Sequence, residues 1–388
     1  MTLNKNMSPT VINLKESEDI RDVVHRVVQS LAEGSIVGVP TESNYCFVAA
    51  GTCKTAVERA CALAEDYHNE PKLTIAIKSC DEAVDWVPDM RPLATRFARQ
   101  CWPGPLAMVL ADNHPDGLVQ QLPVSTQPYV LRDGRIRLRA PRHRILQDCM
   151  RFFAGPVVLA EFGGGPDSPT TVMDLMSRCK EHDKSMLFLD DGIQPIHESV
   201  STIEICDTGY RVIRGNTLSH EDLQRFARLK ILFICTGNTC RSPMAEVLFR
   251  KHVAQRLHCS MNDIRKSGVE VQSAGISAWG GTQASDKAVY AMQQRGIDLN
   301  GHTSQPLTEN LLQKAEIVWT MTAAHRSAIL AQFPNFTDRV HMLSPRNQDV
   351  LDPFGGTQEA YNQCAKQIRE HLDARIDILD LGNSAHIK

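Results

Sequence analysis

The stretch that most constrains the fold is KILFICTGNTCRSPMAE, residues 230–246. It opens with an apolar run, 231–234, and a run without alternation fits a strand buried on both faces of a parallel sheet. Cys235 follows and Arg241 stands six positions later, before Ser242 and Pro243, which predict a helix start with serine at the cap. A strand, a tight loop and a helix N-terminus aim backbone N–H groups and the positive end of a helix at one point. The sequence therefore predicts an anion site in this loop.

The side chains of this loop indicate phosphoryl transfer. A cysteine at the mouth of an anion site is expected to be ionised near neutral pH and to act as a nucleophile. Arg241 can hold two phosphate oxygens at once. Gly237 permits a positive φ, and Asn238 tolerates left-handed backbone and can brace the loop from inside. We therefore predict that Cys235 attacks phosphorus.

The spacing alone is weak evidence, because Cys53 and Arg59 repeat it. The residues between these two contain no glycine, and their surroundings are typical of a helix interior. We therefore interpret Cys53 as a core thiol. Around Cys235 the strand, the glycine and the helix start all occur together, and this context favours function.

Residues 235–246, CTGNTCRSPMAE, resemble the phosphate-binding loop of the low-molecular-weight protein-tyrosine phosphatase family, and more narrowly that of bacterial protein arginine phosphatases. The resemblance covers residues from about 230 to about 378. It implies a hydrolase that acts on phosphorylated proteins through a phosphocysteine intermediate. The substrate-binding positions that it implies are Thr236, Gly237, Asn238, Thr239, Cys240 and Ser242. For Cys240 two interpretations stay open, a protective disulfide with Cys235 or simple packing.

Such a phosphatase needs a general acid, and the candidate is Asp352 in LDPFGG, residues 351–356. Pro353 biases Asp352 towards an extended backbone, and the two glycines let the loop reach over the site. The same carboxylate would later deprotonate the water that hydrolyses the phosphocysteine. An Asp-Pro turn on the surface is the alternative, and the family's D-P-F-G pattern favours catalysis. Asp349 is a weaker candidate for a second carboxylate.

The resemblance also implies supporting residues and a substrate. Ser242 can donate its hydroxyl proton to Cys235, Ser273 braces the loop, and His302 is expected to bond to the Asn238 side chain. Thr239 stands where arginine-directed members carry threonine and tyrosine-directed members a larger aliphatic residue. A small polar wall suits a thin phosphoarginine side chain better than a phosphotyrosine ring. We predict phosphoarginine as the substrate, with phosphotyrosine second, and note that Phe354 stands where many tyrosine-directed members place tyrosine.

Composition sets the broad class. A chain of 388 residues exceeds one average domain, so two domains are expected. Its net charge of −3 gives no general attraction to nucleic acid or to anionic membranes, and no stretch reaches the apolar length of a membrane span. Its 12 cysteines show no spacing typical of zinc sites, so we expect a cytoplasmic protein with reduced thiols, no metal and no cofactor.

The N-terminal part, residues 10–216, alternates helical and strand patterns and predicts an α/β domain. The elements expected there are a helix over 19–33, a strand over 35–40, a helix over 55–66 and a strand over 73–77. In residues 135–139 the period is two, which places Arg135, Arg137 and Arg139 on one face of a strand. That face is either solvated or a patch for phosphates of a nucleotide or RNA.

This region resembles the YrdC family, whose catalytic members are threonylcarbamoyl-adenylate synthases in tRNA modification. The carrying segments are residues 40–45, 102–106, 137–141, 201–203 and 213–215. The departures are Glu65-Asp66-Tyr67 in place of the family's Lys-x-Arg, Ala160-Glu161-Phe162 in place of its Ser-x-Asn, and Cys46 in place of a glycine. A glutamate beside a phosphate reverses the local electrostatics. We expect a domain that keeps the fold, has lost synthase activity, and binds a nucleotide, tRNA or the other domain.

Residues 217–229 have helical spacing and predict a linker, and residues 230–385 form the phosphatase-like domain. Its expected elements after the loop are a helix over 245–256, a strand over 269–272, a helix over 284–295, a strand over 315–321 and a helix over 357–381. Strands that alternate with helices imply a parallel, Rossmann-like sheet with the site at the carboxyl ends of its strands.

Overall fold

The structure is a computed structural model that describes residues 9–64, 70–112, 114–162, 168–179, 186–194, 199–377, 379 and 381. The chain divides into two compact units that meet in sequence between Phe226 and Ala227. This boundary lies in the segment that the sequence assigns to the linker, and helix α8 (His220–Ala227) fills most of that segment. In the part of the chain that is described, no helix has the length and apolar character needed to cross a membrane.

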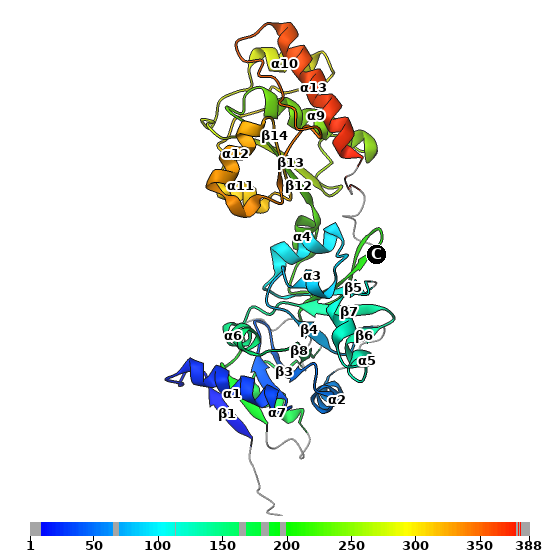
Figure 1. Cartoon of the computed structure of the whole chain (residues 1–388), viewed down its shortest axis with the longest axis vertical. Helices are drawn as coiled ribbons and strands as arrows, with labels where there is room; N and C mark the ends of the chain where they lie inside the picture. The colour runs from blue at the N-terminus through cyan, green and yellow to red at the C-terminus, as the bar shows by residue number, and fades with distance from the viewer. Residues whose placement is uncertain are drawn as a thin grey trace, which may run out of the picture. The chain divides into compact units, whose positions relative to one another are not determined.

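The N-terminal unit is built on one mixed sheet (Figure 1). Among the described residues its strand order is β1-β9-β2-β3-β8-β4-β7-β5-β10-β11, and β6 pairs with β7. The strands are β1 (Thr10–Asn13), β2 (Val37–Pro40), β3 (Tyr45–Ala50), β4 (Thr74–Ala76), β5 (Leu106–Ala111), β6 (Leu131–Arg132), β7 (Arg135–Arg139), β8 (Val157–Ala160), β9 (Leu187–Asp190), β10 (Ser201–Cys206) and β11 (Gly209–Arg214). The helical segments are α1 (Ile20–Ala32), α2 (Lys54–Leu63), α3 (Ala83–Trp86), α4 (Pro92–Cys101), η1 (Leu118–Gln121), α5 (Gln127–Val130), α6 (Arg144–Phe152) and α7 (Val172–Ser177). The predicted α/β class is confirmed.

Local sequence signals explain the first helix of this unit. The Asp19 side chain accepts a hydrogen bond from Arg21 N at 2.8 Å and caps α1. Gly34, with φ +77°, follows the helix end, where a left-handed residue is favoured. The predicted helix over 19–33 is therefore confirmed, with α1 inside those bounds.

The prediction for Cys53 is wrong. Cys53 is the N-cap of α2 and is partly exposed, so it is neither in a helix interior nor in the core. The helix starts one residue before the expected position and ends at Leu63, three residues before the expected end, with Ala64 as its C-cap. The departures at Glu65, Asp66 and Tyr67 lie outside the described residues.

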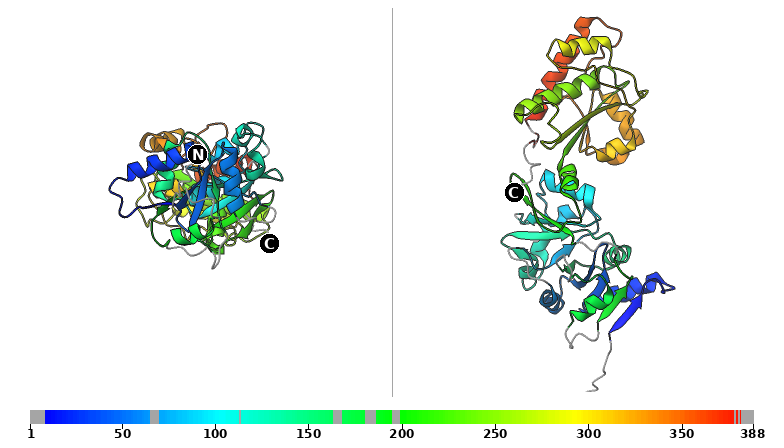
Figure 2. Two further views of the ribbon diagram at one scale, coloured as in Figure 1. Left: turned by 90° about the horizontal axis from the view of Figure 1, so that it is seen from below. Right: turned by 180° about the vertical axis from the view of Figure 1, so that it is seen from behind.

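The C-terminal unit contains a parallel sheet in the order β13-β12-β14-β15. Its strands are β12 (Leu229–Cys235), β13 (Val269–Gly275), β14 (Ile317–Thr320) and β15 (Val340–Met342). Its helical segments are α9 (Arg241–Arg256), α10 (Asp286–Gln293), α11 (Glu309–Lys314), α12 (Ala323–Gln332), η3 (Pro334–Phe336) and α13 (Gln358–Ile376). Helices α9, α10 and α13 cover one face of the sheet, and α11 and α12 cover the other (Figures 1 and 2). The predicted parallel, Rossmann-like sheet is confirmed.

The sheet places the Cys235 loop at its carboxyl edge. In the register of β12 with β13, Cys235 stands opposite Gly275. A Cβ atom on Gly275 would lie 2.5 Å from Thr236 O and 2.9 Å from Asn238 N, which real side chains do not tolerate. Gly275 therefore lets the loop after β12 fold closely over the end of β13, a requirement that the sequence analysis did not identify.

Candidate active site

Cys235 lies inside its loop. The residue is the last of β12 and is 3% exposed, so it is not at the mouth of the site as the sequence led us to expect. The Asn238 backbone N–H donates to Cys235 Sγ at 3.2 Å, and Ser242 Oγ lies 3.0 Å from the same sulfur. A phosphoryl group must therefore enter the loop to meet the sulfur.

Asn238 braces the loop from within. Its Nδ2 donates to Ser242 Oγ and to Ser273 Oγ, each at 2.9 Å, and its Oδ1 accepts from Gln305 N at 2.9 Å. Because Ser242 Oγ accepts from Asn238, its own proton is left for Cys235 Sγ, or for the more distant Ala274 O at 3.4 Å. Asn238, with φ +55°, and not Gly237, adopts the left-handed backbone, because a short amide side chain tolerates it.

Of the two supporting residues, Ser273 contacts Asn238 as expected, and His302 differs from expectation in its partner. His302 Nε2 lies 2.8 Å from the backbone oxygen of Asn238, so the expected bond to the Asn238 side chain is wrong, since that amide is already occupied by Ser242, Ser273 and Gln305. Ser273 also donates to Glu246 Oε2 at 2.7 Å, and burial raises the pKa of Glu246. The bracing network therefore extends from the loop into α9.

The start of α9 lies slightly before the predicted one. The helix begins at Arg241 with Cys240 as N-cap, so Ser242 and Pro243 are its second and third residues. Ser242 is therefore not the cap, and its hydroxyl is used by Cys235 and Asn238 instead.

Arg241 and Asp352 form an ion pair beside the sulfur loop, residues 235–241, which holds Cys235. Arg241 is 5% exposed, and its Nη2 donates to Asp352 Oδ2 at 2.6 Å. Its Nη1 donates to Val350 O at 3.4 Å, and its Nη2 also reaches Thr236 Oγ1 at 3.4 Å. The Asp352 side chain is 51% exposed, so an anion arriving from solvent can replace it at the guanidinium group.

The rest of the Asp352 segment is also defined by hydrogen bonds. Asp352 Oδ1 accepts from Phe354 N at 3.2 Å, and the Phe354 ring is exposed. Asp349 Oδ1 accepts from Ala323 N at 2.8 Å, where α12 begins. This contact gives Asp349 a helix-capping position.

His325 is a residue that the sequence analysis missed. This histidine of α12 is buried, and its Nε2 lies 2.9 Å from Thr236 Oγ1 in the sulfur loop. Its Nδ1 lies 2.9 Å from Thr322 Oγ1, which also caps α12. Burial, and next the charge of Arg241, lower the pKa of His325 to about 4. Thr322 three residues before His325 signals a helix cap, but 89 residues separate His325 from Thr236, so no local pattern links them.

Thr239 and Cys240 complete the loop. Thr239 is partly exposed, and its backbone oxygen accepts from Ser285 N at 2.9 Å. Cys240 is buried, with Sγ 3.3 Å from Ser285 Oγ and 3.5 Å from Tyr361 OH. These contacts account for packing of a free thiol, and a disulfide with Cys235 stays a prediction.

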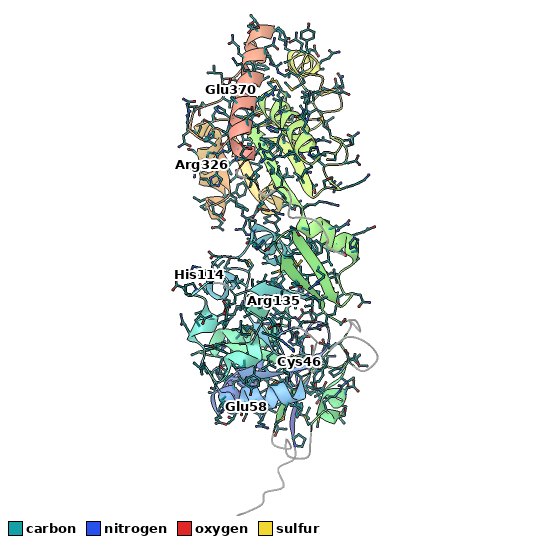
Figure 3. All side chains as sticks on the ribbon, turned by 90° about the vertical axis from the view of Figure 1, so that its right-hand side faces the viewer. Cys46, Glu58, His114, Arg135, Arg326 and Glu370 are labelled. Atoms are coloured by element: carbon teal, nitrogen blue, oxygen red, sulfur yellow. The ribbon has the colours of Figure 1, made fainter. Side chains whose placement is uncertain are left out.

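The arginine strand of the N-terminal unit is not the accessible face that was expected. Strand β7 lies between β4 and β5, and Arg137 and Arg139 are both 0% exposed. Arg135, labelled in Figure 3, pairs with Glu204 at 3.2 Å and keeps a side chain that is 41% exposed. The interpretation as a solvated face is therefore wrong for two of the three arginines, and a nucleotide or RNA contact at this face stays a prediction for Arg135.

Carboxylates occupy the space around the two buried arginines. Arg137 Nη1 donates to Glu70 Oε2 at 2.7 Å and its Nε to Thr74 Oγ1 at 2.6 Å. Arg139 pairs with Glu161 through Nη1 and with Glu42 through Nη2, the latter at 3.0 Å. Burial opposes ionisation of Glu161, but Arg139 and Arg137 outweigh it and lower the pKa of this carboxyl to about 2. The negative charges that balance Arg137 and Arg139 therefore come from glutamates of the same domain.

The geometry of the C-terminal site supports nucleophilic attack inside an anion-binding loop. A sulfur, the Asn238 N–H that donates to it, a guanidinium group and a half-exposed carboxylate converge there. Among the described residues no group of three or more His, Cys, Asp or Glu side chains is arranged to hold a metal ion.

Comparison with known proteins covers both units. The family described as low molecular weight phosphotyrosine protein phosphatase matches residues 230–380, and the Sua5/YciO/YrdC family, described as telomere recombination, matches residues 29–215. A protein-arginine-phosphatase of Bacillus subtilis is 42% identical over 148 residues, which cover 37% of this chain and 92% of that protein. One from Geobacillus stearothermophilus is 36% identical over 39% of this chain and 93% of its own length. A probable low molecular weight protein-tyrosine-phosphatase of Ralstonia solanacearum, EpsP, is 36% identical over 37% of this chain and 91% of its own length. The chain carries a YrdC-like N-terminal domain, and through its C-terminal domain it is a protein phosphatase that belongs to the low molecular weight phosphotyrosine protein phosphatase family.

Proposed function

We propose that the C-terminal domain hydrolyses phosphoarginine in proteins. The observation that carries this proposal is one loop that holds Cys235, Thr239 and Arg241, together with Asp352, which reaches Arg241 from the segment before α13. The names of the two protein-arginine-phosphatases that are 42% and 36% identical to this chain support the same substrate.

The first half-reaction transfers the phosphoryl group to sulfur. The phosphoryl oxygens displace Asp352 from Arg241 and accept from the guanidinium and the loop N–H groups. Cys235 Sγ then attacks phosphorus, an S–P bond forms, and the bond from phosphorus to the guanidino nitrogen breaks. Asp352 takes up a proton from solvent once it has left Arg241 and gives that proton to the departing nitrogen, so arginine leaves as a neutral or cationic guanidine group and not as an anion.

The second half-reaction returns the enzyme to its starting state. Asp352, now a carboxylate, takes a proton from water, and the oxygen attacks phosphorus. The S–P bond breaks, Cys235 leaves as a thiolate, and inorganic phosphate is released. Asp352 then gives its proton to solvent and pairs with Arg241 again. Ser242 Oγ, 3.0 Å from the sulfur, stabilises the thiolate as it forms.

The substrate preference rests on the walls of the loop. Thr239 is short and polar, which suits a thin guanidino group, whereas an aliphatic residue would suit a phosphotyrosine ring. The exposed Phe354 ring and the relative named as a probable tyrosine phosphatase favour phosphotyrosine as the second candidate substrate.

The test is steady-state turnover of a phosphoarginine peptide and of the matched phosphotyrosine peptide by wild type, Cys235→Ser, Asp352→Asn and Thr239→Ile. Cys235→Ser should lose on the order of 10⁴-fold or more in kcat, and Asp352→Asn about 10²- to 10³-fold. Asp349→Asn is the matched control, because its carboxylate caps α12, and it should stay within a few-fold of wild type. Thr239→Ile should shift the kcat/KM ratio towards phosphotyrosine. Equal or better turnover of phosphotyrosine by wild type would refute the arginine preference while leaving the mechanism intact.

We further infer that the N-terminal domain lacks threonylcarbamoyl-adenylate synthase activity. The support is the buried Glu161, which pairs with Arg139 and stands at one of the positions where the sequence departs from the YrdC family. Detectable formation of threonylcarbamoyl-adenylate by the full chain would overturn this inference.

A further inference from the structure

The sulfur loop is connected to α12 by a chain of four side chains. Arg241 Nη2 reaches Thr236 Oγ1 at 3.4 Å, Thr236 Oγ1 lies 2.9 Å from His325 Nε2, and His325 Nδ1 lies 2.9 Å from Thr322 Oγ1. Thr322 Oγ1 also accepts from the His325 backbone N at 3.2 Å, which fixes the far end of the chain to the start of the helix. These contacts therefore tie the Thr236 hydroxyl of the loop to a helix terminus.

This connection matters because Arg241 must change partners during the reaction. Before substrate binds, its Nη2 pairs with Asp352, and a phosphoryl group must replace that carboxylate. The partners that remain for the guanidinium group are Val350 O on Nη1 and Thr236 Oγ1 on Nη2. A planar guanidinium group binds two phosphate oxygens only when its plane is correctly oriented. The Thr236 hydroxyl is thus one of two contacts that can hold that plane.

We propose that His325 is a positioning residue for phosphoryl transfer, which acts through Thr236 to hold the Arg241 guanidinium group in the plane that phosphate requires. The proposal rests on the phosphatase activity of the C-terminal domain and not on its preference for phosphoarginine.

A role for His325 in proton transfer does not fit its surroundings. Both ring nitrogens have hydroxyl partners, Thr236 and Thr322, so neither faces the reacting atoms. The charged groups that act on the ring are Arg241 from α9 and the carboxylates Asp349 and Asp352 from the segment before α13. Burial and the charge of Arg241 lower the pKa of His325 to about 4, so the ring is neutral between pH 5.5 and 8. A neutral ring can act as a donor to one threonine and an acceptor from the other, in either tautomer.

Two substitutions of His325 distinguish its contact with Thr236 from its contact with Thr322. In His325→Gln the side-chain amide ends where Nε2 stood, so it can still donate to or accept from Thr236. In His325→Asn the shorter amide ends where Nδ1 stood, so it keeps Thr322 and loses Thr236. Both variants remove the imidazole, and they differ in which contact remains.

The experiment measures hydrolysis of p-nitrophenyl phosphate and competitive inhibition by inorganic phosphate with the full chain. His325→Asn should lower kcat/KM by about 10- to 30-fold and raise both KM and the phosphate inhibition constant, since a misplaced binding group can cost up to about 10²-fold. His325→Gln should stay within about threefold and should keep the wild-type pH profile between pH 5.5 and 8. Equal losses in both variants, or a missing limb in the pH profile of His325→Gln, would overturn the proposal.

A mutant cycle with Thr236→Val tests the same connection from its other end. Thr236→Val should resemble His325→Asn, and the double variant should be no worse than either single one, because all three break one connection. Additive losses would show that the two residues act independently and would refute the proposal. If His325→Asn fails to fold, His325→Ala, which removes the contacts with both Thr236 and Thr322, takes its place in the cycle. A phosphoarginine preference that proves wrong leaves this test unaffected, because p-nitrophenyl phosphate and inorganic phosphate report on the loop alone.

Discussion

Each domain buries an arginine that pairs with carboxylates, but the carboxylates differ in their exposure to solvent. In the C-terminal domain Arg241 is buried, but its partner Asp352 has a side chain that is 51% exposed. In the N-terminal domain Arg139 is 0% exposed, and the side chains of Glu161 and Glu42 are 5% and 11% exposed. The first carboxylate can leave and be replaced by an incoming phosphoryl group. The second pair cannot open without leaving a buried charge alone, which is costly. Whether an arginine forms a site or a core thus depends on the freedom of its anion to leave.

The largest expected effect tests Arg241, whose carboxylate partner is exposed to solvent. Arg241→Lys should lower kcat/KM on the order of 10³-fold, because lysine is a point charge without the two-pronged grip on phosphate. The matched control is Arg139→Lys in the other domain, for which kcat/KM should stay within about twofold. Steady-state kinetics on a phosphoarginine peptide gives both values. Retention of more than a tenth of wild-type kcat/KM by Arg241→Lys would show that the grip is not required.

The next effect tests the buried ion pairs of Arg139 with Glu161 and Glu42. Glu161→Gln should destabilise the N-terminal domain by about 3 kcal/mol or more, because Arg139 loses one of its two counter-charges while fully buried. Calorimetry of the full chain should show one unfolding transition shifted to lower temperature, while phosphatase kcat/KM is unchanged. An unshifted transition would mean that the cluster relaxes without loss, and the contrast between the two domains would fail.

The pH dependence of stability sharpens the same contrast. Burial opposes ionisation of Glu161, but Arg139 and Arg137 bring its pKa down to about 2, from 4.5 for an unperturbed side chain. A lowered pKa stabilises the folded state above about pH 4.5, and this stabilisation is lost as the pH falls from there towards 2. The loss amounts to about 3 kcal/mol at most. Urea unfolding of wild type and Glu161→Gln at pH 3 and pH 7 should show a smaller acid-induced loss in the variant, and an equal loss would contradict the assignment.

A smaller effect follows from the exposure of Asp352. Asp352→Asn should bind inorganic phosphate about two- to fivefold more tightly than wild type, because the amide no longer competes for Arg241 and a half-exposed ion pair is worth about 1 kcal/mol or less. Competitive inhibition at pH 7 measures the change. Weaker phosphate binding in the variant would mean that Asp352 does not block the guanidinium group.

The smallest expected effect gives a reference value for the stability contributed by an exposed ion pair. Asp207 pairs with Arg91, and their side chains are 88% and 46% exposed. Asp207→Asn should change the free energy of unfolding by about 0.5 kcal/mol or less, because solvent screens this pair. A larger value, found by urea unfolding, would show that exposure is a poor guide to these ion pairs.

Much of the candidate site could be predicted from local sequence. The strand, the loop and the helix around Cys235 follow from an apolar run, a short polar segment and a proline, all within about twenty residues. The contact of Ser242 with Cys235, which the family resemblance implied, is present at 3.0 Å. The sequence allowed a positive φ at both Gly237 and Asn238, and Asn238 is the one that adopts it. The contact of His302 with the Asn238 side chain, which the family resemblance implied, is wrong, because His302 bonds to the backbone oxygen.

Contacts between distant residues could not be predicted in this way. Arg137 reads from the sequence as a surface residue because it alternates with apolar neighbours, yet β7 lies inside the sheet and Glu70 meets it from 67 residues away. His325 reaches Thr236 from 89 residues away, with only a helix cap as a local signal. Gly275 is required because β13 pairs beside β12, a neighbour relation that the spacing of residues does not contain.

The family resemblance added the proposed acid, an aspartate before a proline. The sequence by itself determined the elements and indicated the chemistry at one of them: a cysteine in an anion-binding loop between a buried strand and a helix. Those features depend on backbone preferences and side-chain types that act over a few residues. Only the tertiary structure decided which carboxylate meets which arginine, and whether it can leave. The reason is that burial and ion pairing depend on which strands become neighbours, so Arg241 received a partner open to solvent and Arg139 received partners enclosed in the core.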